Sequence, residues 1–109
     1  MPPKLPLVPG TLDLLVLGAL SGGARHGYGI ATVIEERTHG ALEVEDGALY
    51  QALHRLDRDG LVDSEWRPSE NNRRARYYAL STAGRRRLRQ EALTWRRYSK
   101  AVEAVLQEA

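Results

Sequence analysis

The chain has 109 residues, of which 42% are hydrophobic and 28% charged, and its net charge is +2 at pH 7. This length suffices for one compact core and is too short for two ordinary domains. The absence of cysteine excludes disulfides and thiolate metal sites, and three scattered histidines do not make a ligand set. We therefore expect a single unit without a cofactor or a bound metal.

The first residues and the longest apolar run predict a cytoplasmic protein without membrane contact. The run from Leu14 to Leu20 is far shorter than the ~20 residues that a membrane span needs. Residues 1–6 lack the apolar segment of a secretory signal. Because four of residues 1–10 are proline, we expect an extended N-terminal arm there.

The first two helices follow from short apolar patterns. The first is expected to begin with Thr11 as its N-cap and to continue to Leu20, and its nearly continuous apolar sequence predicts burial on all sides. The second is expected from His26 or Gly27 to His39, with Gly40 closing it. Its core residues recur at helical spacing, namely Ile30, Val33 and Ile34.

The third helix has the clearest pattern, with Asp46 predicted as its N-cap and Gly60 just past its end. One stripe is apolar and predicts the core face: Leu49, Ala52, Leu53 and Leu56. The opposite face holds Gly47, Gln51, His54 and Arg58, flanked by Tyr50 and Arg55. A rigid helix with an outward polar face is typical of a segment that reads a partner.

Two strands are expected next, because the helical period gives way to alternation over residues 61–66 and 76–80. The link between them contains Pro68, Ser69 and Asn71-Asn72, turn residues that tolerate positive φ. We therefore predict a hairpin whose tip and second strand carry Arg73, Arg74 and Arg76.

The last helix is expected from Thr82 to about Gln107. It carries an apolar stripe at alternating heptad spacing, made of Leu88, Ala92, Trp95, Tyr98, Val102, Val105 and Leu106. At 1.5 Å per residue a helix of about 25 residues is about 37 Å long, more than a three-helix core can cover. A second copy of the chain is the most economical partner, which predicts a symmetric homodimer through this stripe.

Together these elements predict a mainly α fold with a small β-hairpin, a winged helix-turn-helix followed by a long C-terminal dimerisation helix. We expect three parts: an arm over residues 1–10, the winged helix-turn-helix over residues 11–81, and the dimerisation helix over residues 82–109. The charge is divided unevenly between them. Residues 1–66 hold five basic and ten acidic residues, whereas residues 67–89 hold eight arginines and one acid. A polyanion would meet this basic segment first, although a solvated arginine face is the alternative.

Three segments resemble the signature segments of the PadR family of bacterial transcriptional regulators: LVPGTLDLLVLGALSGGARHGYGI, GALYQALHRLDRDGLVDSEW and RRARYYALSTAGRRRL. The resemblance covers about residues 7–88. It implies a homodimer that binds an inverted-repeat operator in double-stranded DNA and usually represses, with the long last helix as the interface. Two departures stand out. Family members usually have threonine where this chain has Ala48, and glycine in the wing where it has Asn71-Asn72.

In this interpretation Gln51 and Arg58 can reach base edges, whereas Tyr50 and His54 are better placed for phosphate or sugar. The wing residues Arg73, Arg74 and Arg76 would contact phosphates or enter a narrow minor groove. Alternatives are a core role for Tyr50 and a plain surface role for His54 and Arg58. Tyr28 and His26 are more typical of structural positions than of base readers, with Tyr28 packing or binding phosphate.

Trp95 has two interpretations, as a packed residue of the dimer stripe or as one wall of a site for a flat aromatic ligand. The second follows from the resemblance, since some PadR relatives bind such ligands at the dimer interface. The sequence also leaves open a winged-helix protein-interaction module without sequence-specific DNA binding. An enzyme is not expected, because the chain has no phosphate-binding glycine loop, zinc-protease motif or recognisable catalytic spacing.

Overall fold

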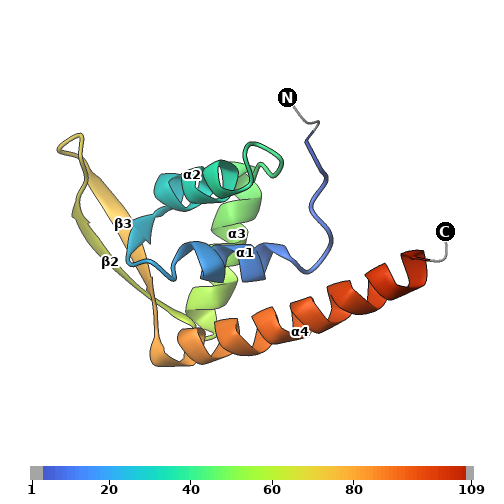
Figure 1. Cartoon of the computed structure of the whole chain (residues 1–109). Helices are drawn as coiled ribbons and strands as arrows, with labels where there is room; N and C mark the ends of the chain where they lie inside the picture. Colours follow the sequence, from blue (N-terminus) through green and yellow to red (C-terminus); the bar gives the residue numbers. More distant parts are fainter. Residues whose placement is uncertain (1–3, 108–109) are drawn as a thin grey trace.

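The computed structural model describes residues 4–107. Its elements in chain order are α1 (Leu12–Ala19), β1 (Arg25–His26), α2 (Gly27–Arg37), α3 (Asp46–Arg58), β2 (Val62–Pro68), β3 (Arg74–Leu80) and α4 (Thr82–Leu106). Helices α1, α2 and α3 pack together, the β2–β3 hairpin projects to one side, and α4 runs along the bundle and past it (Figure 1). The predicted mainly α fold with a hairpin and a long last helix is confirmed.

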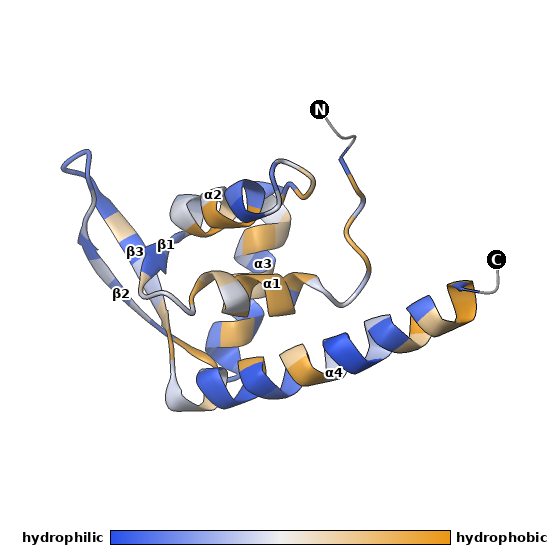
Figure 2. Ribbon diagram, in the orientation of Figure 1, coloured by the Kyte–Doolittle hydropathy of each residue, from blue (hydrophilic) through white to orange (hydrophobic). Residues whose placement is uncertain are grey.

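The core forms where the first three helices meet the base of the hairpin. The predicted α3 stripe is confirmed, since Leu49, Ala52, Leu53 and Leu56 are each at most 2% exposed. Helix α1 is enclosed as expected, and no residue from Leu12 to Leu20 is exposed. In Figure 2 this helix is the most uniformly hydrophobic element of the bundle. Each large side chain buried here stabilises the fold by about 1.5–3 kcal/mol.

Of two predicted helix caps, the position of Thr11 is confirmed and that of Asp46 is wrong. Thr11 occupies the N-cap position of α1, but its hydroxyl donates to the Val8 carbonyl at 2.7 Å and caps no helical N–H. Helix α3 begins one residue earlier than expected, so Glu45 is its N-cap and Asp46 its first residue. Asp46 still contributes, because a carboxylate in the first turn opposes the helix dipole.

The sheet has three strands instead of the two expected, in the order β1-β3-β2. The two-residue strand β1 pairs with β3 through Arg25 opposite Tyr78 and His26 opposite Tyr77. Strands β2 and β3 extend further toward the tip than the alternation indicated, to Pro68 and from Arg74. The turn between them is closed by Asn72 at φ +59°, so an asparagine adopts the conformation that a glycine would otherwise supply.

The start of α4 is joined to the chain that leaves α3. Ser81 is the N-cap: its hydroxyl accepts a hydrogen bond from the Gly84 N–H at 3.0 Å and donates to the Gly60 carbonyl at 2.6 Å. The Ser81 N–H donates to the Leu61 carbonyl at 3.1 Å. Gly84 is buried so close to that carbonyl that a β-carbon would collide with it. A glycine is therefore required here by packing, since its helical backbone suits any residue.

Beyond its first turns α4 leaves the core. Leu88 packs partly against the core of its own chain. From Trp95 onward the stripe is exposed, with values between 40% for Val102 and 75% for Val105, and Leu93 adds an exposed apolar side chain that the heptad pattern did not include. Figure 2 shows hydrophobic segments between hydrophilic ones along the projecting half of the helix. Within residues 4–107 no helix is long and apolar enough to cross a membrane.

Candidate nucleic-acid interface

The outward face of α3 is polar and open to solvent. Gln51, His54 and Arg58 are all exposed on it, opposite the buried stripe that fixes the helix to the core. Arg58 is partly neutralised, because its Nε donates to the adjacent Asp59 carboxylate at 3.1 Å. The face therefore carries one amide and one imidazole with unengaged polar atoms, at positions that a base edge or a phosphate can reach.

Arg55, at the border of this face, is used inside the chain. Its Nη2 donates to the Asp13 carboxylate of α1 at 2.8 Å. That hydrogen bond and the nearby negative charge raise the pKa of Arg55. The ion pair ties α3 to α1, so Arg55 positions the helix and does not face a partner.

The start of α2 is capped by a histidine, which the sequence did not indicate. The Nδ1 atom of His26 accepts a hydrogen bond from the Gly29 N–H at 3.0 Å. The imidazole also makes an edge contact with the Tyr77 ring, with centroids 5.2 Å apart. His26 therefore joins α2 to the centre of the sheet.

Replacing this cap tests its structural role. We expect His26→Ala to lower the free energy of unfolding by about 1 kcal/mol, because the Gly29 N–H loses its acceptor. His26→Asn restores an N-cap oxygen and should recover most of the loss. Urea unfolding of both variants measures the difference. Equal destabilisation by the two changes would show that the ring contact, and not the cap, carries the effect.

Tyr50 at the start of α3 lies against the start of α2. A β-carbon placed on Gly27 would be 2.8 Å from the Tyr50 hydroxyl oxygen, so glycine leaves room for that ring. Tyr50 remains 53% exposed, which makes it neither a core residue nor a free surface residue. The adjacent Tyr28 is 78% exposed. The His26-Gly27-Tyr28 motif thus supplies a cap, a gap for Tyr50 and an outward phenol.

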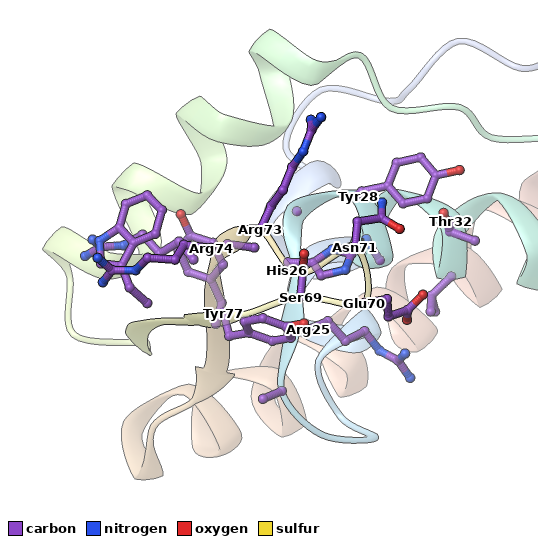
Figure 3. Close-up of a pocket in the computed structure, with 18 of the residues that line it drawn as sticks. Arg25, His26, Tyr28, Thr32, Ser69, Glu70, Asn71, Arg73, Arg74 and Tyr77 are labelled. Carbon is purple, nitrogen blue, oxygen red and sulfur yellow. Dashed lines mark hydrogen bonds between the residues drawn. The ribbon is translucent and has the colours of Figure 1, made fainter.

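The predicted wing arginines differ in how they are held. Arg76 is fixed within the chain, because its Nε donates to the Ser64 hydroxyl at 3.0 Å and its Nη2 lies 3.8 Å from the Asp57 carboxylate. In the described part of the chain, no carboxylate pairs with Arg73 or Arg74. Figure 3 shows the Arg73 side chain extending away from the hairpin tip. Two of the three arginines are thus available to a polyanion.

The other arginines of the basic segment show how much of its positive charge is paired with acidic residues of the same chain. Arg67 stacks on the Tyr77 ring at 3.9 Å and lies 3.8 Å from Glu65, and Arg87 lies 3.6 Å from Glu91. For the rest, the residues that the structure describes provide no acidic partner: Arg85, Arg86 and Arg89. Most of the basic segment is therefore not neutralised by the acidic first half.

A groove of about 850 Å³ lies between the wing, the start of α2 and the start of α3. It brings together five of the eight predicted contact residues: Tyr28, Tyr50, Arg73, Arg74 and Arg76. The other three, Gln51, His54 and Arg58, lie on the outward face of α3. The lining residues that were not predicted as contacts include Arg25, His26, Trp66 and Tyr77, which only the fold places here (Figure 3 labels three of these four). The described residues contain no cluster of potential metal ligands.

Comparison with known proteins assigns the chain to a family. The model of the transcriptional regulator PadR-like family matches residues 16–90, which include α2, α3 and the whole wing. The chain belongs to this family. The matched family is described as one of transcriptional regulators.

Three known proteins show how similar this PadR-like chain is to its relatives. It is 42% identical over 90 residues to an uncharacterised 37.1 kDa protein in a transposon of Streptomyces fradiae, covering 83% of this chain and 24% of that protein. The crystal structure of a PadR family transcription regulator from Clostridium difficile is 28% identical, with a TM-score of 0.77 over 89% of this chain and 99% of that one. Bacillus subtilis PadR in complex with operator DNA is 21% identical and shares the fold, with a TM-score of 0.67 over 75% and 46%.

Proposed function

We propose that this PadR-like chain is a sequence-specific DNA-binding regulator, a homodimer that represses by binding an inverted-repeat operator, one half-site per protomer. The observation that carries the proposal is the outward polar face of α3, held rigid by a fully buried stripe beside a groove lined with arginines. A helix of this kind fits the major groove while a wing contacts the backbone. The Bacillus subtilis relative, which shares the fold, is known in complex with operator DNA.

In this proposal Gln51 and Arg58 read bases, Tyr28, Tyr50 and His54 contact the backbone, and the wing arginines neutralise phosphates. Residues 11–81 form the DNA-binding unit and residues 82–109 the dimerisation helix, after an arm over residues 1–10. Residues 1–3 and 108–109 lie outside the described part of the chain. The protein would act in the cytoplasm, the compartment of its DNA target.

The exposed stripe of α4 supports the homodimer. Six of its side chains would be covered by a second α4, namely Ala92, Trp95, Tyr98, Val102, Val105 and Leu106, while Leu88 would link the stripe to the core. We also propose that a flat aromatic ligand binds beside the paired Trp95 residues and releases the operator. Titration of planar dyes against tryptophan fluorescence tests this ligand site, and the absence of saturable quenching would contradict it.

The deciding experiment is selection of genomic DNA fragments with the purified protein, followed by titration of the recovered site from low to physiological salt. An inverted repeat bound by a dimer, with a preference over random DNA that survives added salt, is the expected result. Recovery of no motif, with all binding lost at moderate salt, would contradict it. Salt-independent capture of a protein partner would instead favour a winged-helix protein-interaction module.

Two substitutions separate base reading from positioning. Gln51→Ala should weaken operator binding about tenfold and relax the preference at one base pair, because its amide no longer pairs with a base edge. Arg74→Ala should weaken binding to all sequences alike, because it removes a phosphate contact. Titrations against operators substituted one base pair at a time measure both effects. A uniform loss in both variants would show that Gln51 does not read sequence.

A further inference from the structure

Trp66 in β2 is a large aromatic residue that the winged-helix pattern does not require. Its side chain is 54% exposed and lies between two arginines, with the guanidinium carbons of Arg74 and Arg76 at 5.8 and 5.7 Å from the ring centroid. Both distances fall within the ~6 Å over which a cation is attracted to an aromatic face. More than half of the surface of Trp66 remains open to solvent.

The strand register shows which way this cluster faces. Trp66 is opposite Arg76, and Arg74 and Tyr78 lie two residues to either side of Arg76 on β3. Alternate residues of a strand share one face of a sheet, and Tyr78 is buried in the core, where burial raises its pKa. Trp66 and both arginines therefore belong to the face turned toward α3, as the contact of Arg76 with Asp57 of α3 confirms.

The two arginines are not equivalent. Arg76 is oriented by Ser64 and Asp57, so it gives the indole a fixed wall. Arg74 lies nearer the tip, and no carboxylate among residues 4–107 neutralises it. The indole N–H of Trp66 and the unpaired positive charge of Arg74 thus lie in the same groove as Tyr50 and Tyr28.

We propose that Trp66 and Arg74 together hold a backbone phosphate of the bound DNA duplex, with the indole N–H as donor and the guanidinium as counter-charge. This inference rests on the DNA binding proposed above. A duplex whose major groove receives α3 presents its sugar-phosphate backbone to the wing beside that helix. A contact of this kind sets the position of the protein on DNA and carries no sequence information. Trp66 is therefore a positioning residue, and Arg73 at the tip is the wing arginine left to enter the minor groove.

The two tryptophans of the chain allow a direct test. Trp95→Phe leaves Trp66 as the only indole, and Trp66→Phe leaves Trp95. Both full-length variants are titrated with a labelled operator duplex, and DNA binding is followed separately by anisotropy of the label. We expect the emission of Trp66 to change with saturation of the DNA and the emission of Trp95 to stay constant. The difference between wild type and Trp66→Phe isolates the same signal if Trp95→Phe alters assembly.

Affinity and salt dependence give a second readout. Trp66→Phe keeps an aromatic ring but loses the indole N–H, so binding to operator and to random duplex should weaken by the same factor, about tenfold. Its slope of log affinity against log salt should stay at the wild-type value, because no charge is lost. Arg74→Ala should reduce the magnitude of that slope by about one.

Three outcomes would overturn the inference in distinguishable ways. DNA binding with unchanged Trp66 emission, or with wild-type affinity in Trp66→Phe, would remove Trp66 from the interface and leave the proposed function intact. Absence of DNA binding by the wild-type chain would overturn both proposals. A Trp66 response to poly-glutamate without one to DNA would assign the groove to an acidic protein segment.

Discussion

Gly84→Ala is expected to destabilise the chain by about 3 kcal/mol, a large part of the 5–15 kcal/mol that holds a small domain folded. The added methyl group would lie 2.9 Å from the Leu61 carbonyl carbon and closer still to its oxygen. Both atoms are backbone, so neither can turn aside as a flexible side chain would. Either α4 must shift away from the core or the Ser81 cap must open. Urea unfolding followed by circular dichroism measures the loss.

Gly18→Ala is the matched control, because Gly18 also lies within a helix and nothing is within 4 Å of its missing β-carbon. Alanine is favoured over glycine in a helix by about 1 kcal/mol, so this variant should be more stable than wild type. The opposite signs separate a packing requirement from helix propensity. Wild-type stability in Gly84→Ala would show that α4 does not pack against the Leu61 carbonyl as described.

Val102→Glu should weaken self-association of the chain by about 100-fold or more. In the proposed dimer a glutamate at this position would be buried without a partner, at a cost of about 3 kcal/mol or more. Operator affinity should fall as well, because two half-sites would no longer be held by linked domains. Analytical ultracentrifugation across a concentration series measures the first effect, and a DNA titration measures the second.

Ala104→Glu adds the same side chain at an exposed position, about 160° around α4 from Val102 at 100° per residue. It should leave both the association constant and the unfolding free energy close to wild type. Equal loss of association in the two variants would mean that added negative charge, and not coverage of the stripe, is responsible. An unchanged dimer in Val102→Glu would place the interface elsewhere on the chain.

Strong periodicity made most of the fold predictable from sequence. The α3 stripe, the enclosed α1 and the length of α4 each depend on many residues that agree with one another, so single exceptions do not matter. The tip turn was also predictable, because Asn72 can adopt positive φ without a glycine. In these places local sequence and tertiary packing favour the same structure.

The sequence-based predictions failed where a single tertiary contact determines the local structure. Strand β1 has two residues, too few for any alternation, and exists because His26 and Arg25 reach β3. Thr11 has a side chain that can cap a helix, but its hydroxyl donates a hydrogen bond to the Val8 carbonyl of the N-terminal arm instead. His26 is an uncommon cap, and the strand β3 that brings Tyr77 against its ring is distant in sequence.

The sequence predicted individual contact residues but not how the fold groups them in space. The α3 face follows from helical geometry and the wing arginines from charge, yet the grouping of Tyr28 and Tyr50 with those arginines in one groove requires the packing of α2 against the hairpin. Arg76 illustrates the difference, since sequence gives its charge but not its hydrogen bond to Ser64. Trp66 was read only as part of an alternating strand, because its arginine neighbours come from β3.

The junction at Ser81 has a consequence for how operators of different length would be tolerated. The N-cap of α4 is hydrogen-bonded to the carbonyls of Gly60 and Leu61, directly after α3, so the start of α4 is fixed to the end of α3. In the proposed dimer the crossing of the two α4 helices would therefore fix both the distance and the angle between the two α3 helices. One extra base pair at the centre of an operator rotates a half-site by about 35°. With the start of α4 fixed to the end of α3, we expect the protein to reject operators of the wrong spacing even when both half-sites are correct.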